Sequence, residues 1–301
     1  MNKPEMLLKN IAILGEGPVW DSKNSILYFV DIDGCKLCSF DYKNYKNNKD
    51  NINKIGGYCE IPAPGRLGAI SMCESPDKFI CAIENNLYLF ENEKFTPFIE
   101  NIYETAGDIR FNDGKCDKNG RFYIGSMDGG GKSRGNLYKI TGNKEVLTCE
   151  NNINCSNGIA FSDDGKYMYY IDTPTGFLWR YDYDSVTGNI ENRTALIDYR
   201  EEKGVFDGMT IDKNGCLWVA LWGGFAVNCY DSVSGKKLDV IELPVPNVTS
   251  CEFGGEDMNI LFITTYGGGN ENLKKEYPLS GSLFALEFDE TKGLECNKFA
   301  I

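Results

Sequence analysis

The stretch SNGIAFSDDGKYMYYIDT, from Ser156 to Thr173, carries the pattern that decides the fold. Two runs rich in aliphatic and aromatic residues flank the dipeptide Asp164-Gly165, where glycine tolerates the positive φ of a tight turn. A pair of strand-like runs around such a turn predicts a β-hairpin. The stretch therefore indicates antiparallel β-structure, and its recurrence along the chain sets the architecture.

Six copies of this turn-and-strand pattern account for the whole chain. They are DSKNSILYFVDID from Asp21, SPDKFICAIENNLYLF from Ser75, DKNGRFYIGSMD from Asp117, SDDGKYMYYIDT from Ser162, DKNGCLWVALWGG from Asp212 and GGEDMNILFITTYGG from Gly254. No stretch has a helical period with caps, and the segment from Tyr42 to Lys54 is expected to be a surface loop. Repeats of about 50 residues with four strands each predict a six-bladed β-propeller over residues 1–301 as one domain. A pair of β-sandwiches and a β-solenoid are the alternatives, although solenoid repeats are usually shorter.

The composition of the chain indicates which binding partners and which cellular compartment to expect. The formal charge of 31 − 44 = −13 repels nucleic acid and anionic membranes, and it attracts cations. No run of 18 apolar residues occurs, and the first ten residues lack the apolar core of a signal peptide. Twelve cysteines without a disulfide spacing fit reduced thiols. We therefore expect a cytoplasmic protein with no nucleic-acid or membrane partner, and a closed propeller is compatible with a monomer.

The chain contains no histidine, and this excludes several kinds of catalytic site. Ser-His-Asp and Cys-His triads are ruled out, as are zinc sites of the H-E-x-x-H type. A catalytic base must then be a carboxylate, a lysine, a tyrosine or metal-bound water.

A second pattern, a short segment containing glycine, lies just before each turn. Its copies are GEGPVWD from Gly15, RLGAISM from Arg66, RFNDGKCD from Arg110, SNGIAFSDDG from Ser156, FDGMTIDKNG from Phe206 and TSCEFGGED from Thr249. The first strand of each propeller blade lines the central channel, so the residue before it lies at the channel mouth. Because equivalent positions on a closed ring converge, we expect Glu16, Asn157 and Asp207 to share a centre. Asn112 should lie nearby, since strand alternation favours Asn112 over Asp113 as the inward side chain.

Two carboxylates and one amide oxygen form a set of hard oxygen ligands. Such a set suits calcium, magnesium or manganese better than zinc. Each of these motifs alone is more typical of a turn than of a metal ligand. A single site built from several motifs is favoured only because they occupy the same position in successive repeats. The sequence therefore predicts one divalent cation, Ca²⁺ first and Mg²⁺, Mn²⁺, Fe²⁺ or Zn²⁺ as alternatives, held by Glu16, Asn157 and Asp207.

With these motifs, the chain resembles the regucalcin/gluconolactonase family, whose members are also called senescence marker proteins. The matching segments are Leu14–Asp21, Arg110–Met127, Ser156–Thr173, Phe206–Gly224 and Thr249–Thr265. The resemblance implies a six-bladed propeller with one divalent ion in its channel, bound by the same three residues. It further implies that Arg110 and Asn112 contact the substrate. Asp128 is the nearest match to the family's acidic residue that binds sugar hydroxyls, although the GGGKSRG segment after it departs from some members.

The activity that these residues and the resemblance predict is metal-dependent hydrolysis of a sugar lactone, similar to gluconolactone, to the aldonic acid. The enzyme would be a carboxylic ester hydrolase. The cation would polarise the lactone carbonyl, and Asp207 would act as general base. Two alternatives stay open. One is a paraoxonase-like or phosphotriesterase-like hydrolase on the same scaffold, and the other is a calcium-binding or interaction propeller without catalysis.

Overall fold

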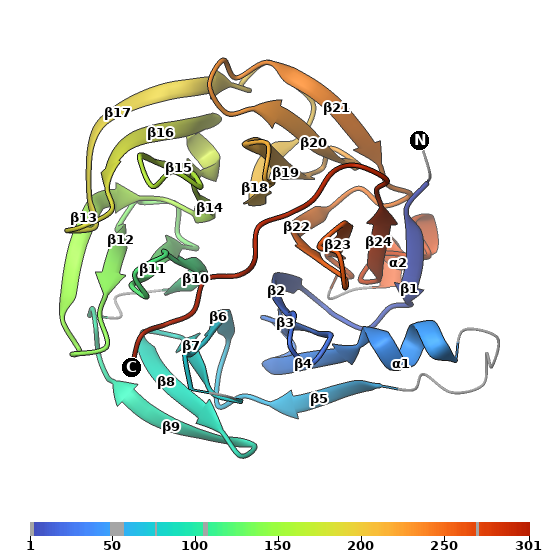
Figure 1. The fold of residues 1–301 in the computed structure, drawn as a ribbon, viewed down its shortest axis with the longest axis horizontal. Coiled ribbons are helices and arrows are strands. Elements are labelled where there is room, and N and C mark those ends of the chain that lie inside the picture. The colour runs from blue at the N-terminus through green and yellow to red at the C-terminus, as the bar shows by residue number, and fades with distance from the viewer. Residues whose placement is uncertain (1–2, 49–56, 76, 105–107, 269–270) are drawn as a thin grey trace.

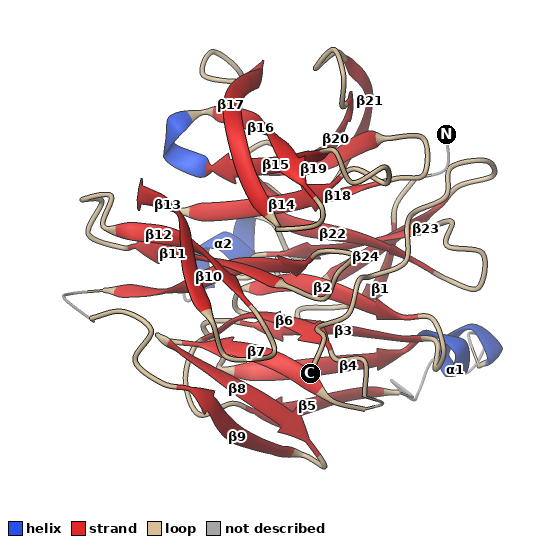
Figure 2. Cartoon of the chain, turned by 60° about the vertical axis from the view of Figure 1, so that its left-hand side comes forward, coloured by secondary structure: helices blue, strands red, loops and turns tan. Residues whose placement is uncertain are grey.

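Six antiparallel sheets of four strands each stand in a ring around a central channel in the computed structural model (Figure 1). The structure describes residues 3–48, 57–75, 77–104, 108–268 and 271–301. This arrangement is a six-bladed β-propeller, so the fold predicted from the repeats is confirmed. A second view shows how strands dominate the molecule (Figure 2).

The strands of each blade follow one another outward from the channel. The innermost strands are β2 (Gly15–Asp21), β6 (Leu67–Met72), β10 (Ile109–Cys116), β14 (Ser156–Phe161), β18 (Val205–Ile211) and β22 (Val248–Gly254). The second strands are β3 (Ile26–Asp31), β7 (Phe79–Ile83), β11 (Phe122–Asp128), β15 (Tyr167–Asp172), β19 (Cys216–Trp222) and β23 (Ile260–Thr265). The third strands are β4 (Lys36–Asp41), β8 (Asn86–Glu91), β12 (Gly135–Ile140), β16 (Phe177–Asp184), β20 (Ala226–Asp231) and β24 (Leu283–Glu287). The outermost strands are β5 (Tyr58–Pro62), β9 (Lys94–Ile99), β13 (Val146–Ile153), β17 (Asn189–Asp198), β21 (Lys237–Glu242) and β1 (Glu5–Leu8).

Burial falls from the channel toward the rim of the ring. Every residue of β6, β14 and β22 is buried, whereas most residues of the outermost strand β17 are exposed. An inner strand has a neighbouring blade against each of its faces, so both alternating sets of side chains enter a core. An outer strand meets water, and its sequence is accordingly polar.

The two ends of the chain close the ring together. The N-terminal strand β1 pairs antiparallel with β24, with Glu5 opposite Ala285, and it becomes the outer strand of the last blade. This pairing gives the last blade its fourth strand from the opposite end of the sequence. The repeated turn pattern starts only at Asp21, so it did not predict the pairing of β1 with β24.

Within the described residues, two short α-helices interrupt the β-structure, contrary to the expectation of none. α1 (Tyr42–Asn47) begins the segment predicted as a surface loop, and α2 (Glu271–Glu276) lies between β23 and β24. The Asp41 carboxylate caps α1 by accepting a hydrogen bond of 2.8 Å from the Asn44 amide. Residues 49–54 of the predicted loop lie outside the described residues. None of the helices in the described ranges has the length and apolar character needed to cross a membrane.

The C-terminal tail, residues 288–301, crosses one end of the channel (Figure 1, dark red). Its backbone amides bond to loops of several blades, with Gly293 donating to the Met258 carbonyl at 2.7 Å and Ala300 to that of Gly120 at 3.0 Å. Phe299 is fully buried near the end of the tail, and its amide donates to the Met72 carbonyl at 2.7 Å. These loops lie where the innermost strands end. The tail therefore covers the end of the channel at which the innermost strands end, and the opposite end stays uncovered by the tail. We call the end where the innermost strands begin the channel mouth.

Candidate active site

The five residues expected to converge lie near the beginnings of four innermost strands, at the channel mouth. Glu16 is on β2, Arg110 and Asn112 are on β10, Asn157 is on β14 and Asp207 is on β18. Each keeps only 5–8% of its surface exposed, although all are polar or charged. Burial of this many polar groups in one place is costly unless they bind each other or a ligand.

A β-bulge lies at the same step of all six innermost strands. The register with the second strand shifts between Glu16 and Val19 in β2, between Asn157 and Ile159 in β14, and between Phe206 and Met209 in β18. The other three shifts occur in β6, β10 and β22. A bulge adds an unpaired residue and re-aims the side chains around it. The expected metal ligands are therefore the residues at these bulges.

The glycine after a candidate ligand lets the neighbouring inner strand come close. A Cβ added to Gly158 would lie 2.9 Å from the carbonyl oxygen of Asp207, and one added to Gly208 would lie 2.2 Å from Oγ of Ser250. Such distances leave no room for a side chain. The glycines thus permit the close packing of β14 on β18 and of β18 on β22, which brings Asn157 and Asp207 to the same part of the channel.

Two carboxyl groups meet at the centre of the site. The carboxyl groups of Glu16 and Asp207 lie close enough for the charge of each to act on the other, and burial followed by the charge of Asp113 raises the pKa of Glu16 from 4.5 to about 8. Burial, and then the charge of Glu16, raises the pKa of Asp207 well above its usual value. In the described part of the chain, neither carboxyl group has a salt bridge to lysine or arginine. The positive charge of Arg110 lowers the pKa of both groups but does not offset their burial, so the two adjacent carboxyl groups can share a proton or bind a cation.

An arginine and two amides complete the site on the side of β10 and β14. Arg110 donates from Nη1 to Oδ1 of Asn112 at 2.6 Å, and Asn112 donates from Nδ2 to Oδ1 of Asn157 at 2.9 Å. The expected inward orientation of Asn112 is therefore seen. Asp113 instead lines a cavity deeper in the channel.

Arg110 is a buried guanidinium that forms no salt bridge among the described residues, although the charges of Asp33 and Glu16 act on it. Its hydrogen bonds run from Nη1 to Asn112 and to the carbonyl of Phe111 at 2.9 Å. An arginine carries five N–H donors, so Nε and Nη2 keep donors that these two bonds do not use. A guanidinium with unused donors beside two carboxyl groups can bind the oxygen atoms of a polar ligand.

Asp128 is at the end of β11, and its carboxylate is occupied by its own loop. Arg134 donates to it from Nε at 2.7 Å and from Nη2 at 2.8 Å, and the amide of Gly130 donates at 2.9 Å. These bonds lower the pKa of Asp128, with the Arg134 guanidinium as the largest cause. The structure therefore places Asp128 in the organisation of the loop from Gly129 to Arg134. Its expected contact with sugar hydroxyls stays a prediction.

Acidic residues at the ends of second strands were missed by sequence reasoning. Asp31, at the end of β3, accepts from the Leu14 amide at 2.9 Å, and Asp172, at the end of β15, accepts from the Cys155 amide at 2.9 Å. Each carboxylate therefore holds the loop that leads into a ligand-bearing strand. The signal was present in the sequence, because YFVD, GSMD and YYID all end a second-strand run with aspartate.

Cys155 is a further residue of the site that sequence reasoning missed. Its Sγ lies 3.7 Å from Nδ2 of Asn157 and 4.0 Å from that of Asn112. Burial, and then the charge of Asp207, raises the pKa of Cys155 to about 12, so the thiol stays protonated at neutral pH. All twelve cysteines are unpaired, as expected from their spacing.

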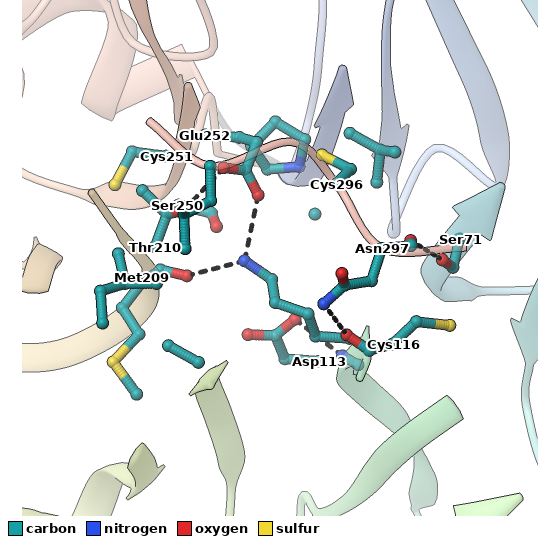
Figure 3. A pocket seen from close by; sticks show the side chains of 18 of the residues that line it. Ser71, Asp113, Cys116, Met209, Thr210, Ser250, Cys251, Glu252, Cys296 and Asn297 are labelled. Atoms are coloured by element: carbon teal, nitrogen blue, oxygen red, sulfur yellow. Dashed lines mark hydrogen bonds and ion pairs between the residues drawn. The ribbon is translucent and has the colours of Figure 1, made fainter. Parts of the chain in front are cut away.

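Below the site, the channel contains a buried ion pair next to a cavity of about 70 Å³ (Figure 3). Lys115 Nζ lies 3.0 Å from Oε2 of Glu252, whose Oε1 accepts a bond of 2.6 Å from Thr210. Cys296 and Asn297 of the C-terminal tail also line this cavity. The lysine neutralises a carboxylate here, whereas the Glu16–Asp207 pair at the mouth has no such partner.

The donors at the mouth fit a divalent cation. Glu16 and Asp207 supply carboxylate oxygens, and Asn157 supplies an amide oxygen, which together form the ligand type preferred by calcium, magnesium and manganese. In the described ranges, no three cysteine, aspartate or glutamate side chains are grouped so as to hold a metal ion. A site here therefore depends on the amide oxygen as its third ligand.

Comparisons with known proteins agree with this architecture. Residues 14–267 match the family described as SMP-30/Gluconolactonase/LRE-like region. A Bacillus subtilis (strain 168) protein named "Putative sugar lactone lactonase YvrE" is 35% identical over 293 residues, which cover 96% of both chains. Regucalcin of Xenopus laevis is 32% identical over 307 residues, covering 99% of this chain and 98% of regucalcin.

Solved structures show the same fold along the whole chain. Regucalcin of Agrobacterium tumefaciens, described as a calcium-binding protein, has a TM-score of 0.89 and 25% identity, covering 100% of this chain and 98% of its own. A luciferin-regenerating enzyme has a TM-score of 0.86 and 27% identity, covering 99% and 100%. With most of its length matched by the family and with relatives above 30% identity, this chain belongs to the SMP-30/gluconolactonase/LRE-like family.

Proposed function

We propose that this protein hydrolyses a sugar lactone to the corresponding aldonic acid, and that it needs one divalent cation to do so. The observation that carries the proposal is the buried pair of carboxyl groups of Glu16 and Asp207, which has no salt bridge among the described residues and lies beside the polar donors of Arg110 and Asn112. The names of two relatives, a sugar lactone lactonase and a calcium-binding regucalcin, support the same reaction and the same kind of ion.

Glu16, Asn157 and Asp207 would hold the cation through their side-chain oxygens. Ca²⁺ is the first candidate, because the ligands are hard oxygens and the chain carries a net charge of −13, and Mg²⁺, Mn²⁺, Fe²⁺ and Zn²⁺ are alternatives. When bound, the cation supplies Lewis-acid polarisation of the lactone carbonyl and balances the two carboxylates.

Asp207 acts as the general base in this proposal. One of its carboxylate oxygens takes a proton from the attacking water as the water oxygen bonds to the acyl carbon. The acyl C–O bond of the ring then breaks, and the proton returns to the departing ring oxygen. The product is a hydroxy acid, and Asp207 is ionised again for the next cycle.

Arg110 and Asn112 bind and orient the substrate. The donors of Arg110 that are not used within the protein can hold the oxygen atoms of a polyhydroxylated ring, which aligns the carbonyl for attack. Asp128 would contact sugar hydroxyls from the edge of the site. Its ion pair with Arg134 has to open, or to be shared with the substrate, for this contact to form.

A lactone panel on metal-defined protein tests the proposal. Chelator-treated protein is reloaded separately with calcium, magnesium, manganese, iron or zinc, and proton release from gluconolactone is followed with a pH indicator. We expect no activity above background without a cation and a preference for polyhydroxylated lactones over simple esters. Cation binding without hydrolysis of any lactone would contradict the proposal and favour a non-catalytic calcium-binding propeller.

The variant Asp207→Asn tests the base and is assayed at saturating cation, because Asp207 is also an expected ligand. Its amide oxygen can still face a cation but cannot take a proton, so we expect kcat to fall by about 10²–10⁴-fold, the usual range for a general base. The matched control is Asp257→Asn, at an exposed aspartate in the loop after β22, which should leave kcat unchanged. Full activity in Asp207→Asn would remove Asp207 as the base.

A further inference from the structure

A chain of hydrogen bonds with a single direction crosses the channel mouth from Arg110 to the backbone before Asp207. Arg110 donates to Asn112 at 2.6 Å, and Asn112 donates to Asn157 at 2.9 Å. Asn157 donates from Nδ2 to Oγ1 of Thr173 at 2.8 Å, and this hydroxyl donates to the carbonyl of Phe206 at 2.9 Å. The chain of bonds therefore links three blades through side chains.

The two ends of the chain of bonds fix its direction. An arginine can only donate, so the atom of Asn112 that faces Arg110 must be its oxygen. The Phe206 carbonyl can only accept, so the Thr173 hydroxyl must donate to it and has its lone pairs free for Asn157. Both amides between these ends have one orientation that satisfies every bond. A second bond agrees, since Asn112 also donates to the carbonyl of Ser156 at 2.7 Å.

The orientation of the Asn157 amide matters because its oxygen is the expected metal ligand. An amide oxygen has two lone pairs, so Oδ1 can accept from Asn112 and still bind a cation. An amide rotated by half a turn would instead present NH₂ protons, which repel a cation. Asn112 fixes the oxygen of this amide, and the nitrogen donates to Oγ1 of Thr173 at 2.8 Å and to the more distant Sγ of Cys155 at 3.7 Å, so Thr173 is its nearer acceptor.

Thr173 is itself held firmly. It opens the 3₁₀ turn η1 (Thr173–Thr175), in which Pro174 follows it, and its amide donates to the Cys155 carbonyl at 3.0 Å. Its hydroxyl also bridges two ligand-bearing strands, because Asn157 is on β14 and Phe206 directly precedes Asp207 on β18. Thr173 thus has the geometry to fix the side chain of one ligand and the backbone of another.

We propose that Thr173 is a positioning residue that orients the Asn157 amide with its oxygen toward the cation and holds the strand that carries Asp207. This inference rests on the proposed function, and it adds a residue that does not touch the cation or the substrate. Loss of an outer-shell partner of a metal ligand usually weakens metal affinity by about 10–100-fold.

Calorimetric titration with calcium and with manganese tests the positioning role without relying on turnover. Thr173→Val keeps the branched shape but removes the hydroxyl, and we expect about 10–100-fold weaker cation binding. Thr173→Ser restores the hydroxyl and should restore most of the affinity. Activity that Thr173→Val loses at low cation concentration should return as the cation concentration is raised.

A matched control is available in the same turn. The hydroxyl of Thr175 donates to the Asp172 carbonyl at 2.7 Å, and no site amide bonds to it. Thr175→Val should therefore leave the cation affinity unchanged. Circular dichroism and thermal unfolding establish that each variant is folded, and Thr173→Ala serves as a second hydroxyl-free variant if Thr173→Val does not fold.

A double-mutant cycle with Asn157→Ala shows whether Thr173 acts through the amide. If it does, adding Thr173→Val to the Asn157→Ala variant should weaken cation binding only slightly further. Equal affinity of Thr173→Val and the parent protein would overturn the positioning role. An undiminished loss in the Asn157→Ala background would overturn the orientation of the Asn157 amide by Thr173 and leave only its bond to the Phe206 carbonyl. If the parent protein binds no divalent cation, the proposed function fails as well. If the parent protein binds and turns over normally while Thr173→Val matches it, only the positioning role fails.

Discussion

The stability of the metal-free protein should fall as the pH rises from about 6 to about 8. Glu16 has its pKa raised to about 8 in the folded state, against 4.5 for an ordinary glutamate. The folded state therefore holds a proton that the unfolded state has already lost in this window. Because the native state binds more protons than the unfolded state, the free energy of unfolding decreases with rising pH.

The pKa of Glu16 sets the size of this effect. A group that titrates at about 8 when folded and at 4.5 when unfolded favours folding, relative to a permanently ionised group, by about 3 kcal/mol at pH 6 and by less than about 1 kcal/mol at pH 8. The expected loss from Glu16 alone is thus about 2 kcal/mol. The pKa of Asp207 is raised for the same reasons, so its titration acts in the same direction.

Urea unfolding of chelator-treated protein at the two pH values measures the loss, and Glu16→Gln is the control. Glutamine keeps the shape of the side chain but does not titrate, so the pH dependence should be smaller by about 2 kcal/mol. Repulsion from the net charge of −13 acts on both proteins and cancels in the comparison. A saturating cation should abolish the loss and release protons on binding at about pH 6, because the ligands must ionise.

Two results would refute the reasoning. The first is an equal pH dependence in the parent protein and in Glu16→Gln. The second is a metal-free protein whose stability rises between about pH 6 and about pH 8. Either result would mean that Glu16 is not held in a buried contact with Asp207.

Three further predictions concern the channel floor, the tail and the loop at the mouth. Lys115→Met leaves the Glu252 carboxylate buried without its lysine partner and should lower the free energy of unfolding in urea by about 3 kcal/mol. This value is the low end for a broken buried ion pair, because the lysine is 28% exposed. Adding Glu252→Gln to this variant should recover most of the loss. Phe299→Ala empties a fully buried site and should cost about 3–5 kcal/mol, so an unchanged Tm would show that the tail does not pack across the channel. Arg134→Ala removes the guanidinium that lowers the pKa of Asp128, so an NMR titration should find this pKa raised, and an unchanged value would rule out the ion pair.

Much of the candidate site followed from repetition in the sequence. Residues at the same step of successive repeats must converge if the repeats close a ring, and this placed Glu16, Asn157 and Asp207 together without any alignment. The absence of histidine excluded imidazole ligands, and the residue types at this step supplied oxygen atoms. Strand alternation also predicted that Asn112 rather than Asp113 lies beside the expected ligands, and Asn112 bonds to Asn157 while Asp113 lines the cavity deeper in the channel.

The roles of Asp128 and Thr173 could not be found in the same way. Asp128 ends a strand as Asp31 and Asp172 do, but its partner is an arginine six residues later in a glycine-rich loop. Thr173 lies 16 residues from Asn157, and the two meet because the turn after β15 folds back over the start of β14. Such contacts depend on loop conformation, which is weakly encoded in short patterns.

The sequence by itself determined the number of blades and predicted a set of oxygen ligands, because both follow from a local period repeated six times. Tertiary structure alone decided the closure of the ring by β1 and β24, the bulges at the ligand positions and the pairing of Lys115 with Glu252, 137 residues away. The physical reason is that a repeating pattern specifies which face of a strand is buried. Contacts between distant segments depend on register and packing, which exist only once all six blades are in place.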